Sequence, residues 1–256
     1  MLRRLAPAML LAFFVLGTAP AAASHVACGD VITQDTMLDS DLSCPGDGLL
    51  IAADGVTLDL GGHTISGPAA GFSAGVKVQH DVTLQDVTIR RGTIRGFEVG
   101  VLAEGGDGLA VRRLAITNNV TGIVIDISFD VVVRHNVIAD NSGLGLFVLD
   151  SNTVRVTGNH ALRNAGDGIH FGGEVSSSVA EGNVASGNGD DGIEVSEIDR
   201  DETGNPIPER NNAVARNLAT YNGDLGIDAV AGTIDGGGNR AFGNGNPLQC
   251  LNIDCG

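Results

Sequence analysis

Two asparagines at a fixed offset recur five times in the middle and C-terminal parts of this chain of 256 residues. The pairs are Asn136/Asn141, Asn159/Asn164, Asn183/Asn188, Asn217/Asn222 and Asn239/Asn244. The steps between their first members are nearly equal, except for one longer step between Asn183 and Asn217. A fixed spacing that returns at nearly regular intervals predicts one structural unit copied along an axis, so we expect a solenoid whose repeats stack on one another.

A short alternation of glycine and apolar residues precedes each asparagine pair. These runs occupy residues 122–125, 143–146, 168–171, 192–195 and 226–229. A period of two, interrupted by Gly, Asn and Asp, predicts short β-strands and tight turns, and no stretch has a convincing helical period. We therefore predict an all-β solenoid of about eight coils of 22–24 residues, with equivalent residues stacked about 4.8 Å apart.

The segment at positions 1–23 has the features of a secretory signal. Arg3 and Arg4 precede an apolar segment at 10–16, and alanines at 21–23 offer a cleavage site. The apolar segment is shorter than the roughly 20 residues that a membrane-spanning helix needs. We expect a secreted or periplasmic protein with an N-terminal cap at 24–47, a solenoid at 48–246 with a loop insertion at 196–210, and a C-terminal cap at 247–256.

Four cysteines lie at the two ends of the expected solenoid, namely Cys28, Cys44, Cys250 and Cys255. An exported chain favours disulfides over metal ligation, although a zinc site is the alternative. Three pairings can be written for four cysteines. The local pairing, in which each bridge closes one end, fits an elongated solenoid whose ends lie far apart and would otherwise fray.

The formal net charge of the chain is −16. An acidic surface repels nucleic acid and acidic lipid. We therefore expect no nucleic-acid partner and no membrane insertion, and we expect the protein to be a monomer.

Two segments and the repeat itself resemble a known family. Residues 57–67 read Thr-Leu-Asp-Leu-Gly-Gly-His-Thr-Ile-Ser-Gly, and residues 246–250 read Asn-Pro-Leu-Gln-Cys. Both are similar to segments of secreted right-handed parallel β-helix proteins of the pectate-lyase-like superfamily. The resemblance implies a right-handed parallel β-helix. It implies no single activity, because members include lyases, hydrolases, epimerases, copper-delivery proteins and adhesive surface proteins.

The recurring asparagines have two interpretations. Their amides could bind sugar hydroxyls, or they could form an internal ladder in which each amide bonds its equivalent in the next coil. A residue that returns at a turn in coil after coil favours the internal ladder.

Basic residues form two columns at the coil spacing. Each column repeats at one constant interval, the length of a coil: Arg90, Arg112 and Arg134 in one, and Arg91, Arg113 and His135 in the other. Guanidinium forks suit carboxylates, so we interpret these six residues as a binding strip for an acidic polysaccharide, continued by Thr157 and Glu181. The alternatives are that the side chains spread into solvent, or that a nearby aspartate neutralises the column: Asp86, Asp107, Asp126 or Asp130.

Catalytic interpretations rest on fewer residues. Arg134 and His135 are positioned to remove the proton next to a uronate carboxylate, as a lyase or epimerase requires. The segment Gly189-Asp190-Asp191 resembles the paired aspartates of polygalacturonases, and two carboxylates are what glycoside hydrolysis needs. The Gly-His-Gly and Arg-Ile-Lys motifs of that family are absent from the sequence. Turn formation is the alternative role of these aspartates.

Metal ions have weaker support. Asp199, Asp201 and Thr203 place oxygens at alternate positions before a glycine, as calcium loops do, but no glutamate stands at the twelfth position. We expect no required cofactor, and calcium is the one metal ion that this loop would bind. Copper delivery would need clustered His and Met, and only His25 near the expected mature N-terminus could serve.

No complete catalytic set can be assembled from these residues. We therefore expect an exported protein that binds or processes an anionic extracellular polysaccharide, with binding slightly favoured. The alternatives are a uronate lyase, epimerase or hydrolase, a structural or adhesive solenoid, and a copper-delivery protein.

Overall fold

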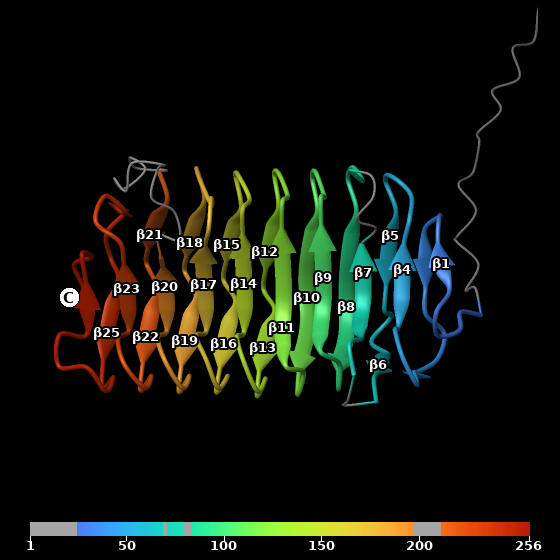
Figure 1. The fold of residues 1–256 in the computed structure, drawn as a ribbon, viewed down its shortest axis with the longest axis horizontal. Coiled ribbons are helices and arrows are strands. Elements are labelled where there is room, and N and C mark those ends of the chain that lie inside the picture. Colours follow the sequence, from blue (N-terminus) through green and yellow to red (C-terminus); the bar gives the residue numbers. More distant parts are fainter. Residues whose placement is uncertain (1–24, 69–70, 79–82, 197–210) are drawn as a thin grey trace, which may run out of the picture.

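The computed structural model describes residues 25–68, 71–78, 83–196 and 211–256, and within them every regular element is a β-strand (Figure 1). One sheet has ten parallel strands, one from each successive level of the solenoid. These strands are β1 (Val31–Ile32), β4 (Leu49–Ile51), β7 (Ala74–Val78), β9 (Val99–Glu104), β11 (Thr121–Asp126), β14 (Leu146–Leu149), β17 (Ile169–Gly172), β20 (Ile193–Val195), β23 (Ile227–Ala229) and β26 (Cys250–Leu251).

The second sheet has sixteen strands and bends sharply within each coil. Before the bend lie β2 (Thr36–Met37), β5 (Thr57–Asp59), the first half of β8 (Thr88–Arg95) and of β10 (Ala110–Thr117), β12 (Val132–Arg134), β15 (Arg155–Thr157), β18 (Val179–Glu181), β21 (Ala213–Ala215) and β24 (Ile234–Asp235). After the bend lie β3 (Leu42–Ser43), β6 (Thr64–Ser66), the second halves of β8 and β10, β13 (Val137–Ala139), β16 (His160–Leu162), β19 (Val184–Ser186), β22 (Leu218–Thr220) and β25 (Arg240–Phe242).

This arrangement is the predicted right-handed parallel β-helix, with about 9 turns. We expected about eight coils between residues 48 and 246. The difference arises because β1 to β3 lie in the expected N-terminal cap and β26 in the expected C-terminal cap, and all four pair with strands of the solenoid. Since the described residues contain no helix, none of them forms a helix that could cross a membrane.

The core is built from stacked aliphatic residues. Ile123, Leu146, Ile169, Ile193 and Ile227 occupy equivalent positions on neighbouring strands and are completely buried. Because side chains alternate along a strand, the residue after each of them points outward. Burying one such aliphatic side chain stabilises the fold by roughly 1.5–3 kcal/mol, so repetition along the axis accounts for much of the stability.

The asparagines form the internal ladders that we predicted. Oδ1 of Asn159 accepts hydrogen bonds from both the backbone N–H and Nδ2 of Asn136, each at 3.0 Å, and Asn136 Nδ2 also donates to the Val111 carbonyl. The second ladder begins one coil earlier than expected, at Asn119. These amides are buried, so they stabilise the turns and are not accessible to a sugar.

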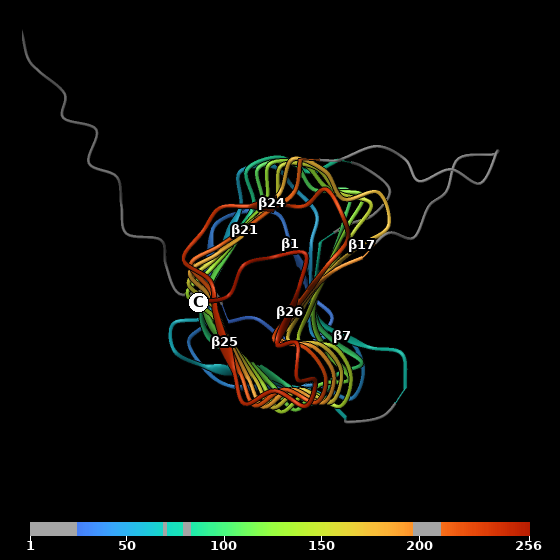
Figure 2. The same ribbon diagram turned by 90° about the vertical axis from the view of Figure 1, so that its left-hand side faces the viewer.

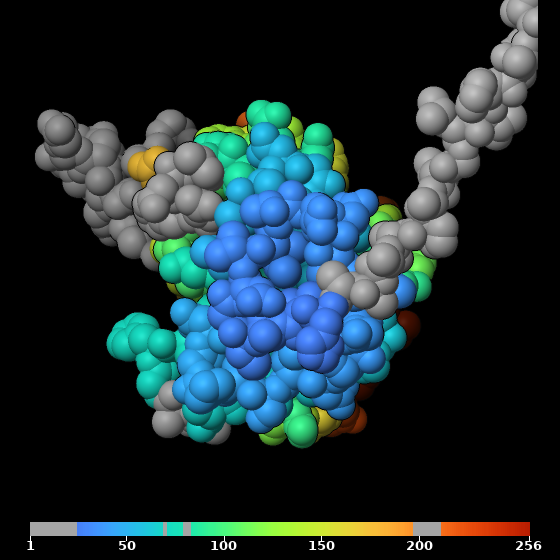
Figure 3. All heavy atoms as spheres, turned by 90° about the vertical axis from the view of Figure 1, so that its right-hand side faces the viewer, coloured from blue at the N-terminus to red at the C-terminus, as the bar shows by residue number. Residues whose placement is uncertain are grey.

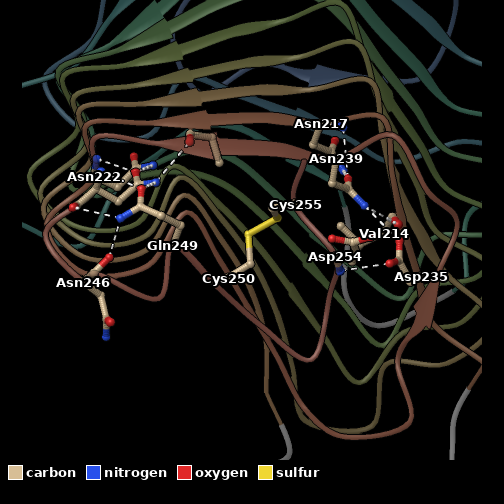
Figure 4. Close-up of a disulfide and its surroundings, with 12 residues drawn as sticks. Val214, Asn217, Asn222, Asp235, Asn239, Asn246, Gln249, Cys250, Asp254 and Cys255 are labelled. Carbon is tan, nitrogen blue, oxygen red and sulfur yellow. Dashed lines mark hydrogen bonds between the residues drawn. A yellow bond between two sulfur atoms is a disulfide. The ribbon is translucent and has the colours of Figure 1, made fainter.

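Both ends of the solenoid are closed by the local disulfides that the sequence favoured, Cys28–Cys44 and Cys250–Cys255. The N-terminal coils cover one end in Figure 3. At the other end, Gln249 Oε1 accepts from the backbone N–H and Nδ2 of Asn244 and so terminates one ladder (Figure 4). Two earlier expectations, the signal at 1–23 and the calcium loop with Asp199, Asp201 and Thr203, lie outside the described residues.

Candidate functional site

The outer face of the ten-stranded sheet carries a continuous row of side chains, here called the outer row. Strand pairing places its members one coil apart: Lys77, Leu102, Val124, Phe147, His170, Glu194 and Asp228. The outline of the solenoid turns inward along this face, as Figure 2 shows from the C-terminal end and Figure 3 from the N-terminal end. A surface pocket of about 300 Å³ lies at its N-terminal end and is lined by Lys77, Leu102 and Phe72, among others.

His170 is the centre of a hydrogen-bonded cluster in the outer row. Its Nδ1 lies 3.0 Å from Oδ2 of Asp167 and 3.0 Å from Oε2 of Glu194. Its Nε2 lies 2.8 Å from Oγ of Ser196, and its ring meets that of Phe147 edge to face with centroids 5.1 Å apart. Contacts on every side fix the ring orientation, as a residue that transfers protons needs.

The pKa values of this cluster are displaced in opposite directions. Burial raises the pKa of Asp167, but hydrogen bonds from His170 and Glu194 outweigh burial and hold it below its usual value. Burial lowers the pKa of His170, but the adjacent carboxylates outweigh burial and raise it. Burial and the hydrogen bond to Asp167 raise the pKa of Glu194 to about 7. A histidine with a raised pKa and a glutamic acid with a pKa of about 7 therefore lie side by side.

Asp191 belongs to the same region, at the turn before β20. Burial and the charges of Asp167 and Asp190 raise its pKa to about 7, although its Oδ1 accepts a hydrogen bond from the Leu225 N–H at 2.6 Å. In the same way, Oδ1 of Asp167 accepts a hydrogen bond from the backbone N–H of Asp191 in the following coil. Asp191 therefore stabilises a turn, which the sequence offered as the alternative to a catalytic role. It also belongs to a cluster of acidic residues.

Two sets of side chains have the geometry to hold a cation. Carboxylate oxygens of Asp167, Asp190 and Asp191 lie within 4.8 Å of one another, as do ligand atoms of Asp167, His170 and Glu194. The first set consists of oxygen donors, which suit Ca²⁺. Burial is the larger cause of the raised pKa values of Asp190 and Asp191, and repulsion from neighbouring carboxylates raises them further. A bound cation would relieve that repulsion.

The basic column lies on the other sheet. Arg90, Arg112 and Arg134 are direct neighbours across β8, β10 and β12, as their spacing predicted, and the row continues with Thr157 and Glu181. Arg91, Arg113 and His135 follow them at the bend, each with a positive φ. The column therefore lies on a different sheet from His170. The candidate catalytic residues Arg134 and His135 are separate from the acidic residues whose pKa values are raised.

The carboxylate that pairs with the column is Asp59, which the sequence did not suggest. It lies 2.8 Å from Nε of Arg90 and 2.5 Å from an Arg91 guanidinium nitrogen. Burial raises the pKa of Asp59, but hydrogen bonds from both arginines outweigh burial and lower it. Of the proposed catalytic residues, only Asp190 and Asp191 lie near His170.

Sequence reasoning missed Asp167, His170, Glu194 and Ser196 as site residues. A signal was nevertheless present in the spacing of His170, Glu194 and Asp228. The two intervals between them are the same as those between three successive asparagines of one ladder. Each is the third residue of an alternating run, which places all three outward on adjacent strands.

The sequence from 39 to 177 matches the family model described as the right handed beta helix region, so the chain belongs to this family. No curated protein matches the sequence. The disulfides at both ends are compatible with an oxidising compartment.

Several solved structures share the fold. A periplasmic alginate epimerase is 20% identical with a TM-score of 0.55, and the match covers 77% of this chain but 47% of that chain. An alginate lyase from Paenibacillus sp. is 15% identical with a TM-score of 0.57 over 89% of this chain and 91% of the lyase. A pectate lyase is 16% identical with a TM-score of 0.54 over 86% and 60%, respectively. This chain therefore spans about half the length of the first epimerase.

Proposed function

We propose that this protein is an enzyme that removes the proton next to the carboxylate of a uronate unit in an extracellular polysaccharide. That step begins both elimination by a lyase and inversion by an epimerase. The observation that carries the proposal is the His170 cluster on the inward-turned face, where the imidazole lies 3.0 Å from the carboxyl group of Glu194, whose pKa is raised to about 7. The solved structures of similar fold support the substrate class, since those named above act on alginate or pectate.

His170 is the proposed base. A raised pKa makes its neutral imidazole a stronger proton acceptor, and the carboxylate of Asp167 stabilises the imidazolium that forms. Proton abstraction leaves negative charge on the substrate carboxylate. Glu194, protonated below about pH 7, can donate a hydrogen bond to that charge and then supply a proton.

The apolar half of the outer row provides the sugar-binding surface. Phe147 packs against His170, and Val124 and Leu102 continue the row toward the pocket that contains Lys77. Sugar rings present apolar faces that pack on such side chains, and Lys77 is a cation for a uronate carboxylate further along the chain. A polysaccharide would thus run across the strands, parallel to the solenoid axis.

A divalent cation fits the same site. Asp167, Asp190 and Asp191 would hold it, with water and substrate oxygens completing the six to eight ligands of Ca²⁺. When bound, it would supply positive charge against the uronate carboxylate. Without it, the neutral forms of Asp191 and Glu194 already reduce repulsion of an anionic substrate up to about pH 7.

The test is exchange with solvent. The full chain would be incubated with alginate and with polygalacturonate in D₂O, with and without Ca²⁺. NMR would detect deuterium at the carbon next to the carboxylate, and ultraviolet absorbance would detect an unsaturated product. Absorbance identifies a lyase, because elimination leaves no hydrogen on that carbon, and deuterium without absorbance identifies an epimerase, which returns a hydrogen from solvent to it. The absence of both from folded protein on each polymer would refute the proposal, and H170N is the matched inactive control.

Hydrolysis of a carbohydrate ester is a second candidate. It is favoured by the hydrogen-bonded series Ser196 Oγ, His170 Nε2, His170 Nδ1 and Asp167 Oδ2, the order found in serine hydrolases. Ser196 Oγ would attack the ester carbonyl while His170 takes its proton. The same proton would leave with the alcohol, and water would release the acyl group. A fluorophosphonate probe should label the protein but not S196A, and the absence of labelling would exclude this chemistry.

A further inference from the structure

The inward-turned outer face of the ten-stranded sheet, which carries the outer row, is here called the groove. The column of arginines on β8, β10 and β12 is a charged surface that the chemistry proposed for the groove does not use. Strand pairing places the Cα atoms of Arg90, Arg112 and Arg134 directly opposite one another on adjacent strands. Equivalent side chains on adjacent parallel strands are about 4.8 Å apart, and like charges at that distance repel one another. Such repulsion is unusual in a chain with a net charge of −16, which has acidic residues in excess to neutralise it.

Only the N-terminal end of the column is neutralised. Asp59 binds both Arg90 and Arg91. In the part of the chain that the structure describes, no carboxylate lies within ion-pair distance of Arg112, Arg113 or Arg134. The Arg112 Nε is moreover buried without any hydrogen-bond acceptor. An unpaired buried donor beside unpaired guanidinium groups indicates that an external acceptor is missing.

The electrostatics agree with this geometry. Burial, followed by repulsion from Arg90 and Arg134, lowers the pKa of Arg112. The charge of Asp59 only partly offsets these two effects, and an anion on this surface would oppose them further.

The bend beside the column provides an independent observation. Arg91, Arg113 and His135 each adopt a left-handed backbone conformation, with φ between 55° and 59°. The next two coils place Gly158 and Gly182 at the same bend, with φ of 62° and 63°. Glycine adopts this conformation without strain, so the fold itself does not require a side chain here. Three consecutive basic residues at this bend therefore extend the cationic surface at a conformational disadvantage.

We propose that Arg112, Arg113, Arg134 and His135 form a binding strip for the carboxylates of an acidic polysaccharide, separate from the groove of the ten-stranded sheet. The proposal takes its substrate class from the proposed function. Arginine forks bind carboxylates through two parallel hydrogen bonds. His135 follows Arg113 in the second column, and Thr157, which carries a hydroxyl, follows Arg134 in the first. The strip would hold a polymer against the protein while the groove acts on another part of it.

Acidic residues limit the strip at both ends. Asp59 occupies the position before Arg90, and Glu181, two coils after Arg134, pairs with Arg216. The free basic residues therefore occupy two adjacent coils, about 5 Å apart along the axis. A few uronate units suffice to fill it, so long polymers gain affinity mainly by engaging the strip and the groove together.

The experiment is affinity electrophoresis of the full chain through gels containing polygalacturonate, alginate or a neutral glucan. We expect retardation by the uronate polymers that decreases with salt, and no retardation by the glucan. The double variant R112A/R134A should weaken retention about tenfold, whereas R163A, which removes an exposed arginine paired with Asp140, should leave it unchanged. R112K/R134K, which keeps the charge and loses the forks, should be intermediate. Circular dichroism and urea unfolding confirm that each variant is folded.

Two results would overturn the proposal: equal retention of folded R112A/R134A and the parent protein, or equal retention by the neutral glucan. Failure of the proposed function would look different. H170N should lose solvent exchange and keep retention, whereas R112A/R134A should weaken retention and keep exchange on short oligouronates. If H170N abolishes retention while R112A/R134A does not, the groove is the only binding surface.

Discussion

Nδ1 of His170 lies 3.0 Å from Oε2 of Glu194 across the paired strands β17 and β20. Each group alters the protonation of the other: the carboxylate raises the pKa of His170, and the imidazolium lowers that of Glu194 against a larger effect of burial. The two residues therefore titrate as a pair, and the state with one proton between them contains both a base and an acid.

A bell-shaped dependence of kcat/KM on pH follows from this pair, with the acid limb set by His170 and the alkaline limb by Glu194. At lower pH both residues are protonated and the base is lost. At higher pH, above the pKa of about 7 of Glu194, the acid is lost. Initial rates of solvent exchange or product formation from pH 5 to 9 measure the profile.

The variant E194Q should change the shape of that profile. Glutamine keeps a hydrogen-bond donor at every pH, so the alkaline limb should disappear. Removal of the neighbouring charge should also lower the pKa of His170 and move the acid limb to lower pH. We expect kcat to fall about tenfold, and about 100-fold or more in H170N. An E194Q profile with the same two limbs as the parent would show that Glu194 is not the titrating acid.

Asp191 should make the protein less stable as pH rises. Its folded-state pKa of about 7 lies above its ordinary value of 3.8, so the folded state alone holds this proton between about pH 4 and 7. The free energy of unfolding therefore decreases through that window, and above pH 7 the folded protein contains a buried ionised carboxylate. The decrease is at most about 4 kcal/mol for a shift of three units.

D191N tests this linkage, because Asn keeps the Oδ1 acceptor for the Leu225 N–H and cannot ionise. Urea unfolding should give similar stabilities for D191N and the parent at pH 4 and a more stable variant at pH 8. D130N, at an exposed aspartate, is the control and should differ little from the parent at either pH. A stability difference for D191N that does not grow with pH would contradict the raised pKa.

The repeat made the fold and the register predictable, but only part of the site. Equal spacing in sequence becomes adjacency in space, which is why Arg90, Arg112 and Arg134 meet as expected. The prediction of which aspartate pairs with the column was wrong because one early coil is longer than the others. Asp59 lies in register with Arg90 although 31 residues separate them. Counting back by one average coil does not reach it.

The His170 cluster escaped prediction for a different reason. Its chemistry depends on burial and on charges that converge from three turns, and no motif encodes those quantities. His170, Glu194 and Asp228 differ in residue type, so they do not appear as a repeat although their spacing matches that of the asparagines. The intervals that revealed the arginine column would also have revealed this row, had outward positions been compared across coils without regard to residue type.

Asn159 should be among the most sensitive positions for stability. Its Oδ1 accepts from the N–H and Nδ2 of Asn136, and its own Nδ2 donates to Val133 and Asn183. N159A leaves buried donors of Asn136 unpaired and should lower the free energy of unfolding by about 2–4 kcal/mol. N246A, at the exposed C-terminal turn, removes one accepted hydrogen bond and should lower it by about 1 kcal/mol or less. Equal effects of the two variants in urea unfolding would show that the ladder contributes little.

The Cys250–Cys255 disulfide should protect the C-terminal end without stabilising the whole solenoid. Each coil contacts mainly its neighbours, so opening begins at an end, and β26 is the last strand of its sheet, paired with β23 and tied by this bridge. Closing so short a loop contributes roughly 2 kcal/mol. In C250S/C255S, hydrogen exchange should accelerate in β25 and β26 and remain slow in β14. C28S/C44S should accelerate exchange at β1 and β3 instead, and uniform acceleration in either variant would mean that the coils unfold as one cooperative unit.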